Sequence, residues 1–115
     1  MSEPVPHPIP ASLAEMIAER FRVLGDPTRI RLIDALRDGP LSVRELQEAT
    51  GHSQQNVSKH LRMLFAAGMI DRARAGTSAR YSIADEGVFE LCEHVCGGLR
   101  RRVDQLDAVV PGERA

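Results

Sequence analysis

The 115-residue chain has no long apolar run, no tryptophan and only two cysteines. A membrane-spanning helix needs roughly 18 or more consecutive apolar residues, so we predict no membrane partner. Residues 1–11 contain four prolines and lack the basic start of a signal peptide, and we interpret them as a disordered arm. Two cysteines without an export signal predict a cytoplasmic protein with free thiols rather than a structural disulfide.

The chain also lacks an excess of charge of either sign, because its net charge is −1. This value alone argues weakly against a nucleic-acid partner. However, residues 52–82 contain five Lys or Arg residues against one Asp. A local basic patch matters more than the charge of the whole chain when the partner is a polyphosphate.

Residues 53–67 have the pattern of an amphipathic helix. Their apolar residues follow the i, i+4, i+7 and i+8 spacing of one helical face: Val57, Leu61, Leu64 and Phe65. Ser53 is a good N-cap, and the opposite face offers amides, a hydroxyl and cations, which bind base edges and phosphates. The polar groups predicted to bind DNA here are Ser53, Gln54, Gln55, Ser58, Lys59 and Arg62. The alternative is an ordinary helix with a solvated polar face.

Two more helices are predicted at the start of the domain. The first covers residues 13–24, and Ser12 and Glu15 have the spacing of a capping box. The second follows at once, with Asp26 as N-cap and Pro27 at the first helical position. Both have apolar residues at helical spacing, which predicts that each buries one face.

A third predicted helix, residues 43–49, immediately precedes the helix at 53–67. Ser42 and Glu45 form a second S-x-x-E capping box at its start. Residues 50–52, which include a glycine, form the turn between the two helices. Two helices joined by such a turn are the signature of a helix-turn-helix, whose second helix enters the major groove of DNA.

After the helix-turn-helix the pattern changes to two short β-type segments, residues 69–74 and 80–84, joined by a turn-rich link. The predicted hairpin carries three cations: Arg72, Arg74 and Arg80. A basic hairpin after a recognition helix is typical of a wing that contacts phosphates or the minor groove. The alternative is a solvated edge hairpin whose arginines deter aggregation.

The last predicted helix starts at Asp85, which is its N-cap, and ends near Val110. Its near-heptad seam consists of Val88, Cys92, Val95, Leu99, Val103 and Leu106. A small domain has little core for so long a helix, so the seam predicts a homodimer formed by the first and last helices. The fold class is therefore mainly α with a small β-hairpin: a winged helix-turn-helix of about five helices and a two-stranded wing. It spans residues 12–110, and residues 111–115 are expected to fray.

Four segments together resemble the ArsR/SmtB family of winged-helix repressors: F-R-V-L-G-D-P-T-R-I-R-L-I-D-A-L, L-S-V-R-E-L, S-Q-Q-N-V-S-K-H-L-R-M-L-F-A-A-G-M-I and R-Y-S-I. The resemblance covers residues 21–83. It implies a homodimer that represses transcription from palindromic, double-stranded operator DNA and leaves it on a metal, metalloid or oxidant signal. It also implies a set of base-reading residues: Gln54, Gln55, Ser58, Lys59 and His60.

The chain departs from the two best-known metal sites of that family. Many members carry a C-x-C motif in the first helix of the helix-turn-helix, where residues 42–46 have no thiol. Others carry D-x-H in the last helix; Asp85 matches, but Gly87 stands where histidine is expected. Neither ligand set can therefore be carried over.

The candidate inducer site is instead Cys92 and Cys96, which lie four residues apart on a predicted helix. Helical i, i+4 side chains have Cβ atoms about 5–6 Å apart, whereas a disulfide needs roughly 3.5–4.5 Å. A bridging thiophilic metal or metalloid (Zn, Cd or As) or a polysulfide fits this gap; a direct disulfide requires unwinding. The other interpretations are a persulfide or disulfide modification at Cys92 and Cys96, a single reactive cysteine, or cysteines that only pack.

An enzyme is not predicted, because His94 should point away from both cysteines and no other base accompanies them. The leading prediction is a sequence-specific DNA-binding repressor. The alternatives are a winged-helix module that binds protein, and a repressor whose thiols sense no inducer.

Overall fold

The structure is a computed structural model that describes residues 4–109, with side chains to residue 106. The predicted tail at residues 111–115 lies outside the described part. The elements in chain order are α1 (Ala11–Leu24), α2 (Pro27–Ala35), β1 (Leu41–Ser42), α3 (Val43–Thr50), α4 (Gln54–Ala66), β2 (Ile70–Ala75), β3 (Ser78–Ile83) and α5 (Glu86–Val109). Elements α1 to β3 form one compact unit, and α5 belongs to a second. None of the described helices is long and apolar enough to cross a membrane.

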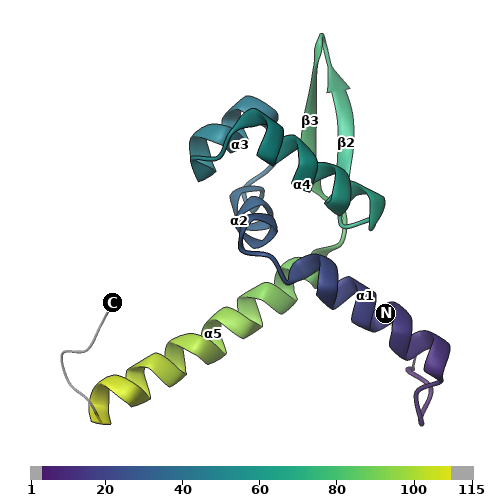
Figure 1. The fold of residues 1–115 in the computed structure, drawn as a ribbon, viewed down its shortest axis with the longest axis vertical. Coiled ribbons are helices and arrows are strands. Elements are labelled where there is room, and N and C mark those ends of the chain that lie inside the picture. Colours follow the sequence, from purple (N-terminus) through teal and green to yellow (C-terminus); the bar gives the residue numbers. More distant parts are fainter. Residues whose placement is uncertain (1–3, 110–115) are drawn as a thin grey trace. The chain divides into compact units, whose positions relative to one another are not determined.

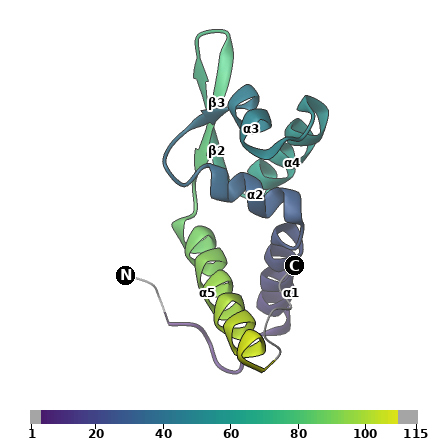
Figure 2. The same cartoon turned by 90° about the vertical axis from the view of Figure 1, so that its left-hand side faces the viewer.

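The core of the first unit lies between α2, α3, α4 and the start of β2. Its fully buried side chains are Leu32, Ile33, Leu36, Leu46, Val57, Leu61, Leu64, Met69 and Ile70. The apolar stripe predicted for residues 53–67 is confirmed at three of its four positions. Phe65 is the exception, because its side chain is 51% exposed. In two perpendicular views, the β2–β3 hairpin projects beyond α3 and α4 (Figure 1; Figure 2).

The sheet has three antiparallel strands in the order β1-β3-β2. The predicted hairpin is confirmed, but its link is a two-residue turn rather than five residues, because Ala75 already pairs with Ser78. Gly76 in that turn has a φ of +66°, which a glycine adopts without steric cost. Strand β1 was not predicted, since two residues are too few to show a period. It pairs Leu41 with Tyr81.

Four of the five predicted helix caps are confirmed. The carboxylate of Asp26 accepts hydrogen bonds from the first turn of α2, and Ser53 does the same for α4. Ser42 and Glu45 form the reciprocal capping box of α3. The capping box expected at Ser12 is wrong, because α1 begins at Ala11 and Pro10 occupies the N-cap position without a side-chain bond. Residue 12 therefore lies inside the helix.

Two helices leave most of their apolar residues exposed. In α1, only Leu24 is buried, while Met16, Ile17 and Phe21 are exposed. In α5, Val88 is buried and Cys92 is half-buried, but the rest of the predicted seam is exposed: Val95, Leu99, Val103 and Leu106. Asp85 precedes this helix as predicted, and its Oδ1 accepts a hydrogen bond from the Gly87 N–H at 3.0 Å.

Candidate nucleic-acid interface

The turn between α3 and α4 fixes where α4 begins. Gly51 adopts a left-handed conformation with a φ of +78° after the last residue of α3. The Ser53 hydroxyl then accepts a hydrogen bond from the Asn56 N–H at 3.1 Å. His52 lies between these residues, with Nδ1 3.2 Å from Asn56 Nδ2 and Nε2 3.5 Å from Thr28 Oγ1 on α2. The first turn of α4 is therefore connected to the α3–α4 turn through Ser53 and His52, and to α2 through His52.

Helix α4 separates a buried apolar stripe from an exposed polar face. The exposed residues of that face are Ser53, Gln54, Gln55, Lys59 and Arg62, and Ser58 is half-buried. The exposed side chains on this face are accessible to a ligand. This is the arrangement by which a recognition helix reads base edges and phosphates.

His60 does not lie on this exposed face, so the structure gives no support to the prediction that it reads a base. Its side chain is only 6% exposed, and its Nδ1 lies 3.0 Å from Nη1 of Arg29 on α2. Residue 60 is three positions after Val57 and four before Leu64. It therefore belongs to the buried stripe, which a resemblance in sequence alone does not reveal.

The three wing arginines lie on two faces of the sheet. Arg72 and Arg74 share the face of the buried Ile70, because alternate residues of a strand point the same way. Arg80 pairs with Ala73 and therefore lies on the opposite face. Its Nη1 is 3.6 Å from the carboxylate of Glu45 and 3.4 Å from the Pro40 carbonyl oxygen.

The contacts of Arg80 fasten the wing to the start of α3. Its partner Glu45 also accepts a hydrogen bond from the Ser42 N–H at 2.9 Å. That backbone bond and a side-chain bond to Ser42 lower the pKa of Glu45, so it stays ionised near neutral pH. The structure thus gives Arg80 an intramolecular role that the prediction of three equivalent DNA contacts missed.

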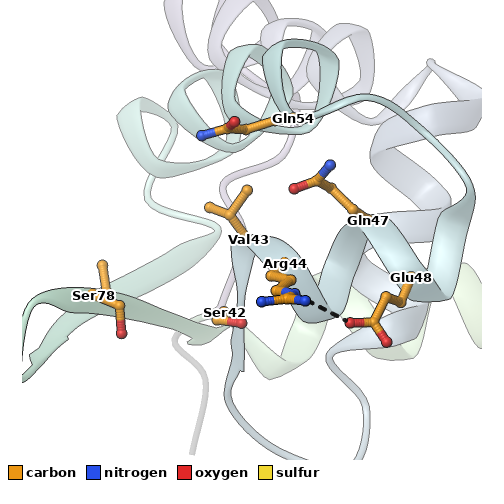
Figure 3. A pocket seen from close by; sticks show the side chains of 8 residues that line it. Ser42, Val43, Arg44, Gln47, Glu48, Gln54 and Ser78 are labelled. Carbon is orange, nitrogen blue, oxygen red and sulfur yellow. Dashed lines mark ion pairs between the residues drawn. The ribbon is translucent and has the colours of Figure 1, made fainter.

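Two hollows flank the recognition helix. A groove of about 260 Å³ lies between α4 and the wing, and its lining includes Ser58, Arg62, Arg72 and Tyr81. A wider hollow of about 950 Å³ opens between α3, the start of α4 and β3. Figure 3 shows Gln47 and Arg44 of α3 beside it, opposite Gln54, with Arg44 paired to Glu48 at 3.9 Å.

Sequence reasoning missed Arg44 and Gln47 as neighbours of the recognition helix. The only available signal was their i, i+3 spacing on α3, opposite the buried Leu46. That spacing is common on any solvated helix, so it could not have singled them out.

The two cysteines lie on α5, where Cys92 is half-buried and Cys96 is exposed. Burial, and after it the Glu93 carboxylate, raises the pKa of the Cys92 thiol. Among the residues with described side chains, no three His, Cys, Asp or Glu groups converge as metal ligands. Two thiols do not complete a tetrahedral zinc site, so the described part of one chain does not fit such a metal alone.

A helix-turn-helix with an exposed polar recognition helix, followed by a cationic wing, defines a winged helix-turn-helix DNA-binding protein. The model of the family described as "Bacterial regulatory protein, arsR family" matches residues 26–72. The HTH-type transcriptional regulator NmtR of Mycobacterium tuberculosis is 37% identical over 86 residues, which are 75% of this chain and 72% of NmtR. The chain belongs to the ArsR family of DNA-binding transcriptional regulators and is not an enzyme.

Solved structures agree with this assignment. The AntR antimony-specific transcriptional repressor is 33% identical, with a TM-score of 0.76 over 87% of this chain and 90% of that one. A homodimeric winged helix-turn-helix DNA-binding domain from Mycobacterium bovis is 27% identical. Its TM-score is 0.70 over 87% of this chain and 91% of that domain. The predicted fold class is confirmed.

Proposed function

We propose that this protein is a homodimeric repressor that binds a specific operator through α4 and the wing. The observation that carries the proposal is the exposed polar face of α4, together with the exposed Arg72 and Arg74 on strand β2. The residues assigned to the DNA are Ser53, Gln54, Gln55, Ser58, Lys59, Arg62, Arg72 and Arg74. The glutamines suit base edges, whereas the cations suit phosphates or guanine.

This function can be tested without knowing the operator. The wild-type protein is used to select duplexes from a random 30-base-pair library, and the enriched sequence is called the selected duplex. We expect one enriched sequence with two-fold symmetry, since a symmetric dimer presents two identical recognition helices. Affinity should fall steeply with salt, because bound cations displace condensed counterions. If no sequence is enriched, the protein does not read operator DNA.

The homodimer is proposed from the exposed apolar residues of α1 and α5. Each helix leaves large apolar side chains exposed in the described chain, and exposed apolar groups of this kind mark an interaction site. The homodimeric state of the Mycobacterium bovis domain supports a second copy of this chain as the occupant. The near-heptad spacing along α5 suits a helix of the same kind as partner.

The inducer is proposed to act at Cys92 and Cys96. The AntR likeness supports a thiophilic metal or metalloid, and two thiols at i, i+4 on α5 supply soft ligands. A complete site needs further ligands, which the second copy could provide. Persulfide or disulfide chemistry at the same thiols is the competing signal, and two cysteines that only pack is the alternative to any sensing.

The test compares wild type with the Cys92→Ser and Cys96→Ser variants, alone and combined. Each is bound to the selected duplex and treated in turn with zinc, cadmium, arsenite, peroxide and polysulfide. We expect unchanged affinity without a signal, and loss of release by the effective signal in each variant. If the double variant responds normally, the thiols only pack.

A further inference from the structure

Arg29 is a buried cation that connects three helices. It lies on α2, is only 8% exposed, and its Nε–H donates to the Val23 carbonyl oxygen near the end of α1. Its Nη1 lies 3.0 Å from His60 Nδ1 and 3.2 Å from Met63 Sδ, both on the recognition helix. A buried charge is costly unless its donors are satisfied, and here the partners come from α1 and α4.

A second arginine joins the same two helices. Arg20 of α1 donates from Nη1 to the carbonyl oxygen of Ala67, the C-cap of α4, at 3.0 Å. The middle and the end of α4 are therefore both held to α1. Because α1 also carries part of the proposed dimer surface, these contacts set the position of each recognition helix relative to α1.

The contact with Arg29 fixes the protonation state of His60. A guanidinium has five donors and no acceptor, so Nδ1 of the imidazole must accept the hydrogen bond. The ring is then neutral and carries its proton on Nε2. Protonation of His60 places a donor against a donor and two positive charges in contact inside the protein.

The other charged groups around His60 partly oppose one another. Asp26, at the start of α2, favours the protonated ring, while Lys59 on α4, Arg29 and His52 oppose it. Burial is the strongest influence, and the net result is a pKa below the ordinary value of 6.5. His60 is therefore neutral near pH 7, as the hydrogen bond from Arg29 requires.

We propose that Arg29 and neutral His60 position the recognition helix for operator binding, and that protonation of His60 releases the operator. This inference rests on the proposed DNA-binding function. It assigns His60 a role that does not involve contact with DNA. Arg29 is a positioning residue because it acts on the operator only through α4.

The direction in which DNA affinity changes with pH distinguishes this mechanism from a general electrostatic effect of histidine protonation. Protonating exposed histidines adds positive charge and should strengthen binding to a polyanion. The positioning mechanism instead predicts weaker binding to the selected duplex in acid. One linked proton per subunit, and so two per dimer, limits the loss to about a hundredfold per pH unit below the pKa of His60.

The experiment measures affinity for the selected duplex from pH 5 to 8, with far-UV circular dichroism to confirm folding. Wild type should lose affinity in acid, and His7→Asn, a matched change at an exposed histidine, should behave like wild type. His60→Asn should be nearly independent of pH, since Asn Oδ1 is as many bonds from the backbone as Nδ1 and accepts from Arg29. Flat or stronger wild-type binding in acid, while the fold persists, overturns the proposal.

A second measurement uses no DNA and no variant of His60. Nitrogen-15 NMR of the wild-type imidazoles should show His60 with the proton on Nε2 and a pKa below 6.5. A ring that is protonated at Nδ1 near pH 7 overturns the inference even if His60→Asn fails to fold. If no duplex is selected at any pH, the proposed function fails while this NMR result still decides the state of His60.

Discussion

Replacing Leu99 by alanine should weaken the proposed dimer. The size of the loss depends on how much of the Leu99 side chain is exposed in the single chain and would be covered in the dimer. The side chain is 60% exposed in the described chain. Complete burial of a leucine is worth about 1.5–3 kcal/mol, so covering the exposed part contributes roughly 1–2 kcal/mol. A symmetric dimer contains the change twice, and the total of about 2–4 kcal/mol raises the dimer dissociation constant roughly 30- to 700-fold.

Sedimentation equilibrium over a range of protein concentrations measures this constant directly. Arg101→Ala is the matched control, because Arg101 is an exposed α5 residue outside the apolar seam and should change the constant only about twofold. Leu99→Glu should leave a monomer that fails to bind the selected duplex. A folded Leu99→Ala protein with the dissociation constant of wild type would refute the role of this seam in assembly.

Three further predictions concern stability, the wing and the inducer. Ser42→Ala should lower the free energy of unfolding, measured by urea denaturation, by about 1 kcal/mol, whereas Ser12→Ala should leave it unchanged. An equal loss of unfolding free energy in both variants would contradict the observed caps. Arg74→Ala removes one cation per subunit and should reduce the slope of log affinity against log salt by about 1.8 for the dimer, while Arg80→Ala should leave it unchanged; the reverse result would exchange their roles. Because the Cys92 thiol has a raised pKa and must lose its proton to bind metal, cadmium should release DNA at lower concentration at pH 8.5 than at pH 7.0. Equal concentrations at both pH values would argue against Cys92 as a ligand.

The sequence predicts most of the first unit because its local signals agree with its packing. The Asp26 cap and the Ser42–Glu45 capping box act within a few residues, and both are observed. The Ser12 capping box fails because the same residues can lie inside a helix when the helix starts two residues earlier. Strand β1 is too short for any pattern and exists only through its pairing with β3.

The candidate interface was harder to predict, because its details depend on which face a side chain occupies. His60 stands among the predicted DNA-reading residues in sequence, yet its angular position on α4 buries it against Arg29. Arg80 resembles Arg74 in composition, but the register of β2 and β3 places it on the opposite face, beside Glu45. Both facts depend on tertiary partners far along the chain.

The most direct test of the central claim is whether α4 reads base sequence. Affinities of wild type, Gln54→Ala and Gln55→Ala are measured on the selected duplex and on a scrambled duplex of the same length and composition. At least one of the two substitutions should weaken the binding free energy by about 1–3 kcal/mol on the selected duplex and by little on the scrambled one. Equal losses on both duplexes, or no loss on either for both variants, would contradict base reading by this face of α4.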